Sequence, residues 1–207
     1  MSEIETTATE TTGKRDKESI ILGSGDLYYQ AFTDEVPDID SLCVNDNLIG
    51  AIQGGATIEY SPSFYTASDD SGKLKKTVLT EENATLKTGL MSLIGKRLEQ
   101  ICSTARADTE TESGKRIVKI GGVGNFDNTK YVWCFHHTDN VDGDIWVLVV
   151  GLNTSGFTLA FQRDKETVVD VEITCEPQDE DGTLIQYIEE IGSIAADDEE
   201  DENDSPD

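Results

Sequence analysis

Alternation of apolar and polar side chains is the sequence feature that most narrows the possible folds of this chain. Between residues 167 and 176, apolar side chains take every second position and polar ones the positions between: Val169, Val171, Ile173 and Cys175 against Asp170, Glu172, Thr174 and Glu176. A period of two places successive side chains on opposite faces of a strand. The segment is therefore predicted to be a strand with one buried face and one face in water.

The same reasoning predicts further strands. Residues 145–151 are apolar on both faces, as in a strand inside a sandwich, and residues 131–138 place three aromatic side chains on one face. These two segments are expected to form the core hairpin, with a turn at residues 142–144. The remaining strands are expected over residues 52–61, 157–161 and 183–190.

One segment has helical spacing instead. Apolar side chains from Leu90 to Ala105 recur with a period of about 3.6, and charged side chains lie on the opposite side. This spacing predicts an amphipathic helix over about residues 92–105, with Ser92 as its N-cap. A single helix can cover an open face or edge of a sheet. The predicted fold class is mainly β, a β-sandwich or barrel with one flanking α-helix.

Charge and composition divide the chain into three parts. Residues 1–18 have too few apolar side chains to fold, so we expect a flexible N-terminal arm. Residues 195–207 hold eight carboxylates and no cation, and their mutual repulsion predicts a disordered acidic tail. Because the arm carries −2 and the tail −8, residues 19–194 keep −16 of the total −26. These residues are expected to form one acidic domain whose partners are basic proteins or copies of itself, not nucleic acid or anionic membranes.

Neither a secretion signal nor a membrane span is visible in the sequence. The first residues lack the charged and then apolar pattern of a secretory signal, and the longest apolar run, residues 145–150, is far shorter than the roughly 20 residues of a membrane span. We therefore expect a soluble protein made in a cytoplasm. The four cysteines are far apart and include no CxxC pair, so we expect reduced and mostly buried thiols.

Cys134, His136 and His137 form the only cluster of soft metal ligands. On a strand, Cys134 and His136 share one face and His137 points to the other, so two of the three side chains can converge at most. A closed zinc site needs four ligands. No motif for a nucleophile or a phosphate loop is found elsewhere, and the sequence therefore predicts a protein that is not an enzyme, with no catalytic, cofactor or metal site.

A long polar excursion at about residues 66–77 is predicted to be a hairpin. With its neighbours it gives an order of elements that resembles the major tail tube protein of long-tailed bacteriophages, especially siphophages of Gram-positive hosts. The resemblance covers roughly residues 20–191 and rests on five stretches: GATIEYSPSFYTASDDSGKLKKTVL, ATLKTGLMSLIGKRLEQIC, NTKYVWCFHHTDN, DGDIWVLVVGLNTSGFTLAF and VVDVEITCEPQDEDGTLIQYIEE.

The resemblance implies a six-subunit ring in which each subunit adds strands to a continuous inner β-barrel. Stacked rings would form the tail tube of a virion and conduct the genome at ejection. DNA would pass without specific binding, because carboxylates along the bore repel phosphates. The implied partners are copies of the chain and the tape measure, tail tip and tail terminator proteins, and no membrane. The chain would be made in the host cytoplasm and would end in the virion tail.

Two groups of residues are candidates for these roles. The hairpin residues that could reach the next ring are Ser68, Asp69, Asp70, Ser71, Gly72 and Lys73. The carboxylates that could line the bore are Glu59, Asp170, Glu172 and Glu176. An ordinary solvated strand face would show the same alternation, so the pattern alone does not separate the two interpretations.

Two other functions stay open at this point. An acidic module could mimic DNA and occupy the basic site of a DNA-binding protein, as its size and charge allow. Another phage structural protein, for capsid decoration or tail completion, could be built on a similar sandwich.

Overall fold

The computed structural model describes residue 21 and residues 23–91, 95–110, 113–161, 163–164 and 166–191. The predicted arm, residues 1–18, and the predicted acidic tail, residues 195–207, lie outside the described residues. The described chain is mainly β, with antiparallel pairing and few helical residues, which confirms the mainly β part of the predicted fold class.

Ten strands and five short helical segments make up the described chain. The strands are β1 (Asp26–Ala31), β2 (Leu48–Gly50), β3 (Ile52–Ser68), β4 (Lys75–Leu90), β5 (Ala105–Glu110), β6 (Lys115–Ile120), β7 (Tyr131–His137), β8 (Ile145–Asn153), β9 (Val169–Glu176) and β10 (Gln186–Glu189). The helices are α1 (Ile39–Leu42) and α2 (Leu98–Ile101), with 3-10 turns η1 (Asn45–Asn47), η2 (Gly95–Arg97) and η3 (Val123–Asn125).

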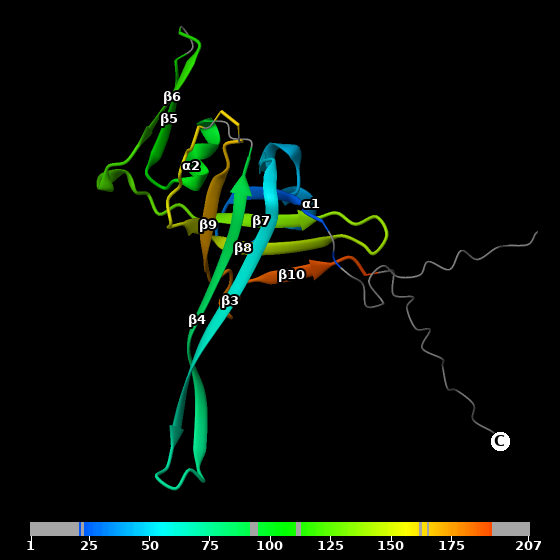
Figure 1. The fold of residues 1–207 in the computed structure, drawn as a ribbon, viewed down its shortest axis with the longest axis vertical. Coiled ribbons are helices and arrows are strands. Elements are labelled where there is room, and N and C mark those ends of the chain that lie inside the picture. The colour runs from blue at the N-terminus through cyan, green and yellow to red at the C-terminus, as the bar shows by residue number, and fades with distance from the viewer. Residues whose placement is uncertain are drawn as a thin grey trace, which may run out of the picture.

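Eight of these strands form one antiparallel sheet that branches at β8. The strand order is β2-β1-β7-β8-β9-β4-β3, and β10 also pairs with β8. The first half of β8, residues 145–148, pairs with β10, whereas residues 150–153 pair with β9. Figure 1 shows β3, β4 and β9 running together while β7 and β8 cross them. Within the described residues the sheet does not close into a barrel.

The two faces of β7 and β8 are both buried, because each faces a different apolar cluster. The main core lies between the β1-β7-β8 half and the β9-β4 half of the sheet, and includes Leu86, Leu90, Trp133, Val149 and Ile173. The second core lies on the opposite face of β7 and β8, under α1, and consists of Leu42, Val132, Cys134, Leu148 and Val150. Near-continuous apolar sequence in β8 follows from this double coverage.

The core hairpin and the alternating strand form as predicted. β7 and β8 pair antiparallel from His137 opposite Ile145 to Tyr131 opposite Gly151. In β9 the apolar side chains are buried and the side chains between them are partly or fully exposed, as a period of two requires. The last strand, predicted over residues 183–190, is found as the shorter β10.

The predicted helix over residues 92–105 is wrong in its extent. The described helical residues are η2 and the single turn α2, and Ala105 already begins β5; the predicted cap Ser92 lies outside the described residues. The chain turns after Ile101, where the Ala105 N–H donates to the Cys102 carbonyl and the Asn153 side chain donates to the Ile101 carbonyl. The Asn153 side chain thereby provides the hydrogen-bond donor that the carbonyl at the helix end would otherwise lack. Residues 105–110 pair with β6 as the strand β5.

A short helix that the sequence analysis did not expect, α1, covers the second core. Asp38 caps it by accepting a hydrogen bond from the Ser41 N–H at 2.9 Å.

A strand predicted over residues 157–161 is absent from the described chain. The strand before this segment in the chain is β8, and the end of β8 is already paired with β9. The side chain of Phe161, predicted to be buried by the strand, is exposed.

Gly151 sits where β8 meets β9, and a side chain there would overlap the backbone oxygen of Thr174. Its own carbonyl accepts a hydrogen bond from the indole N–H of Trp133 at 3.2 Å. We expect Gly151→Ala to lower the free energy of unfolding by about 2–4 kcal/mol, because backbone on both strands would have to shift. Urea unfolding would measure the loss.

Gly124→Ala is the matched control, because a Cβ at position 124 would meet no atom within 4 Å. It should change the free energy of unfolding by no more than about 0.5 kcal/mol. Equal effects of the two substitutions would contradict the packing described at Gly151.

Candidate functional site

The cluster of Cys134, His136 and His137 does not form a common site. Cys134 faces Cys43, with 3.6 Å between the sulfur atoms. His136 pairs through Nε2 with the Asp144 carboxylate at 2.8 Å and stacks on Trp146. His137 bonds through Nδ1 to the Ser24 carbonyl. The three side chains thus have three separate sets of partners, and among the described residues no three potential metal ligands gather.

The hairpin formed by β3 and β4 is the most prominent feature of the described chain (Figure 1). Its root packs on the main core through Ile58, Ala84 and Leu86. Beyond Tyr60 the two strands remain paired with each other as far as Ser68, which lies opposite Lys75, but nearly all of their side chains are exposed. The polar hairpin predicted at about residues 66–77 is therefore the tip of a longer ribbon.

The candidate hairpin residues Ser68 to Lys73 form the end of β3 and the turn itself. Asp69 organises this turn: its carboxylate accepts hydrogen bonds from the Leu74 N–H at 2.7 Å and from the Ser71 hydroxyl. These bonds favour the charged carboxylate and lower its pKa. Gly72 follows with a φ of +67°, which favours glycine. The tip thus has a defined shape even though its side chains are exposed.

Apolar side chains are exposed along both faces of this ribbon. Phe64 pairs across from Leu79, and Tyr65 pairs across from Val78 on the opposite face. Phe64 and Tyr65 are each 62% exposed. Leu74, next to the tip, is exposed as well. A two-stranded ribbon with this much apolar surface in water typically has a packing partner.

The candidate carboxylates lie on the polar face of β3, β4 and β9, and a cation joins two of them. Lys87 on β4 stands between the other two strands, with Nζ 3.2 Å from Glu59 on β3 and 3.7 Å from Glu172 on β9. The hydrogen bond to Glu59 and the charge of Glu172 raise the pKa of Lys87. Glu176 pairs separately with Lys130. The structure thus brings Glu59 and Glu172 together and places Glu176 in a different ion pair.

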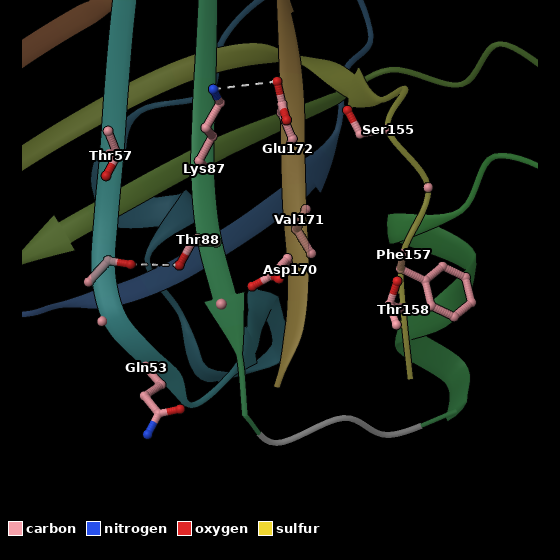
Figure 2. A pocket seen from close by; sticks show the side chains of 14 residues that line it. Gln53, Thr57, Lys87, Thr88, Ser155, Phe157, Thr158, Asp170, Val171 and Glu172 are labelled. Atoms are coloured by element: carbon pink, nitrogen blue, oxygen red, sulfur yellow. Dashed lines mark hydrogen bonds and ion pairs between the residues drawn. The ribbon is translucent and has the colours of Figure 1, made fainter. Parts of the chain in front are cut away.

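An open groove of ≈ 450 Å³ follows this polar face. Figure 2 shows Asp170 and Glu172 on β9, Lys87 and Thr88 on β4, and Ser155 to Thr158 on the far side of β9. Gly89 lines the groove and has no room for a side chain: a Cβ there would clash with a Val168 methyl group and come too close to the Gln53 carbonyl oxygen. On β3, Gly54 and Gly55 form a bulge, and the Thr88 hydroxyl bonds to the Gly55 carbonyl at 2.9 Å.

Sequence reasoning missed two parts of this surface. Lys87 was not singled out, because its two partners come from other strands and only the register brings them together. The exposed aromatics of the ribbon were also missed, although the adjacent pair Phe64 and Tyr65 breaks strict alternation and could have signalled it. In the described part of the chain, no helix is long and apolar enough to cross a membrane.

No model of a protein family matches the chain, and no curated protein matches it.

The shared cation of the polar face gives a salt-dependent prediction. Replacing Lys87 by Met leaves Glu59 and Glu172 facing each other without a counterion, so we expect a lower midpoint of urea unfolding at low ionic strength. In about 1 M NaCl, where the screening length is roughly 3 Å, the difference should shrink. Lys87→Arg keeps the charge and is the control. A loss that is the same at both salt concentrations would contradict the ion-pair account.

The turn at Asp69 gives a pH-dependent prediction. Because its pKa is lowered in the folded state, the hydrogen bonds at the tip stabilise the turn above the ordinary carboxyl pKa of 3.8 and are lost as the pH falls through the lower folded value. The amide resonance of Leu74, followed by NMR, should titrate with a midpoint below 3.8. Asp69→Asn should abolish this titration. A midpoint at or above 3.8 in the unchanged protein would contradict the assignment.

Proposed function

We propose that this chain is a structural virion protein that assembles with copies of itself into stacked six-subunit rings, the tail tube of a long-tailed bacteriophage. The observation that carries the proposal is the β3–β4 ribbon, whose outer half is paired but exposes apolar side chains to water. A segment of this kind is stable when a neighbouring molecule covers it. In a stack of rings, the neighbour is the next ring.

Open strand edges support the ring. In the described part of the chain, β3 is paired only with β4, and β2 at the other end of the sheet is paired only with β1. A 17-residue edge strand is an aggregation hazard unless it is covered. A cyclic interface between subunits would cover both ends of the sheet and complete the continuous inner β-barrel of a tail tube.

Charge supports a bore that does not hold DNA. The net charge of −26 disfavours contact with phosphates, and the candidate carboxylates hold two nearby lysines: Lys87 pairs with Glu59 and Glu172, and Lys130, before β7, pairs with Glu176. Lysines held in this way are less free to neutralise a DNA backbone. The face that holds Glu59, Asp170 and Glu172 is therefore our candidate for the lumen, and DNA would pass along it without specific binding.

In this role the protein performs no catalysis, and its mechanism consists of assembly and electrostatic repulsion. The tape measure protein would lie inside the tube before ejection, and tail tip and tail terminator proteins would bind its two ends. The protein would thus be located in the virion tail after its synthesis in the host cytoplasm.

Electron microscopy of the purified chain tests the proposal. The full chain, concentrated or mixed with tail-tip proteins, should form rings and tubes. Phe64→Ser combined with Tyr65→Ser should prevent the stacking of rings while the melting temperature stays unchanged, because both side chains are mostly exposed in the single chain. Val123→Ser combined with Phe161→Ser removes two apolar side chains that are also exposed but lie off the ribbon, and should leave assembly intact.

Two results would contradict the proposal. The unchanged chain could remain monomeric under every condition, with no rings or tubes in the micrographs. Alternatively, the Phe64 and Tyr65 variant could form tubes as readily as the unchanged chain, which would remove the ribbon as a contact between rings.

A further inference from the structure

Two cysteines that are 91 positions apart in the sequence meet at the second core. Cys43 is the C-cap residue of α1, and Cys134 lies in the middle of β7. Their sulfur atoms are 3.6 Å apart. Cys134 is fully buried, whereas Cys43 is partly exposed. All four cysteines are free thiols in this structure; Cys134 and Cys175 are buried, and Cys43 and Cys102 are partly exposed.

The two thiols differ in reactivity. The hydrogen bond between them lowers the pKa of Cys43, and it raises the pKa of Cys134, which burial raises further. Cys43 is therefore both the more accessible and the more easily ionised of the two, and the thiolate is the nucleophile in thiol–disulfide exchange. Cys134 is placed to attack any sulfur that becomes attached to Cys43.

The other cysteines lack such a neighbour. Cys102 has the Thr104 hydroxyl as its neighbour at 3.6 Å. Cys175 belongs to the main core, on the other side of the sheet from Cys134, and burial raises its pKa to about 11. Closing the gap between Cys43 and Cys134 from 3.6 Å to a bond of about 2.05 Å needs only a small shift at the end of α1.

We propose that Cys43 and Cys134 form a dithiol site that reacts with a low-molecular-weight disulfide and closes an intramolecular disulfide bond between α1 and β7. In the first step the Cys43 thiolate attacks the reagent, RSSR; a new S–S bond forms at Cys43 and RS⁻ leaves. In the second step Cys134 loses its proton, displaces the second RS⁻ and forms the Cys43–Cys134 bond. The protein dithiol is oxidised by two electrons, and RSSR is reduced to two RSH.

The second step becomes easier once the first has occurred. The capped Cys43 sulfur is neutral, so it no longer opposes ionisation of Cys134 through the charge and hydrogen bond of a thiolate. The new bond would hold α1 against β7 and close a loop of the chain from residue 43 to residue 134. A cross-link over such a long loop restricts the unfolded state strongly. The proposal stands on the two thiols alone and does not depend on the proposed assembly.

The test uses 2-hydroxyethyl disulfide, because a neutral reagent is not repelled by a protein of charge −26. After incubation of the folded full chain, remaining thiols are alkylated under denaturing conditions, and the protein is digested with trypsin. Each cysteine then lies in a different peptide: residues 18–73, 98–106, 131–163 and 166–207. Mass spectrometry should find the first and third peptides joined, and the intact mass before alkylation should fall by about 2 Da for the two hydrogens lost.

Thermal unfolding provides a second readout. The oxidised chain should melt roughly 5–15 °C above the reduced chain, and dithiothreitol should reverse the shift. Cys43→Ser, a change at a partly exposed position, should abolish both the joined peptide and the shift. Cys102→Ser, at a similarly exposed position, is the matched control and should retain both.

Three outcomes would overturn the proposal. Cys43 and Cys134 could both be alkylated after full exposure to the reagent. Cys43 could stop at the mixed disulfide with the reagent, which would show that Cys134 cannot reach it. The joined peptides could contain Cys102 or Cys175 instead, which would show that the observed contact does not decide the pairing.

Discussion

The fold depends on one strand, β8, which is paired along both edges and covered on both faces. Along one edge it pairs with β7, and along the other it is divided between β10 and β9. The division falls beside Gly151, where β9 approaches so closely that no side chain fits. Because β8 joins both halves of the sheet, the main core, the second core and the position of the long hairpin all follow from this one strand.

The outer half of the β3–β4 ribbon is the opposite case. Its strands are paired, but its side chains contribute little to either core and expose aromatic rings to water. We propose that contacts between copies of the chain cover the ribbon and the open edges of the sheet, and that the ion-paired polar face lines the bore.

Sequence patterns predicted those elements whose signal is independent of their neighbours. Alternation in β9 and continuous apolar sequence in β8 identified both strands, because burial on one or both faces fixes these patterns directly. The predicted strand over residues 157–161 is absent because Leu159 and Phe161 are exposed and not buried on one face, and the edge of the preceding strand, β8, is already paired with β9. The helix was predicted too long, because the helical spacing is realised in only one turn, in which Leu98 and Ile101 are buried. The helix α1 was missed because four residues are too few to show a helical period. The role of Lys87 depends on the register of three strands, which sequence does not contain.

Hydrogen exchange of the ribbon tests most directly whether other copies of the chain cover it. In the monomeric full chain, the amides of residues 60–82 should exchange fast through local opening of the ribbon. The amides of β7 and β8 should be protected at every protein concentration. Our account predicts that exchange in residues 60–82 slows markedly as the full chain is concentrated into the range where it assembles, while exchange in β7 and β8 stays constant. Assembly into rings or tubes with unchanged, fast exchange of residues 60–82 would contradict it.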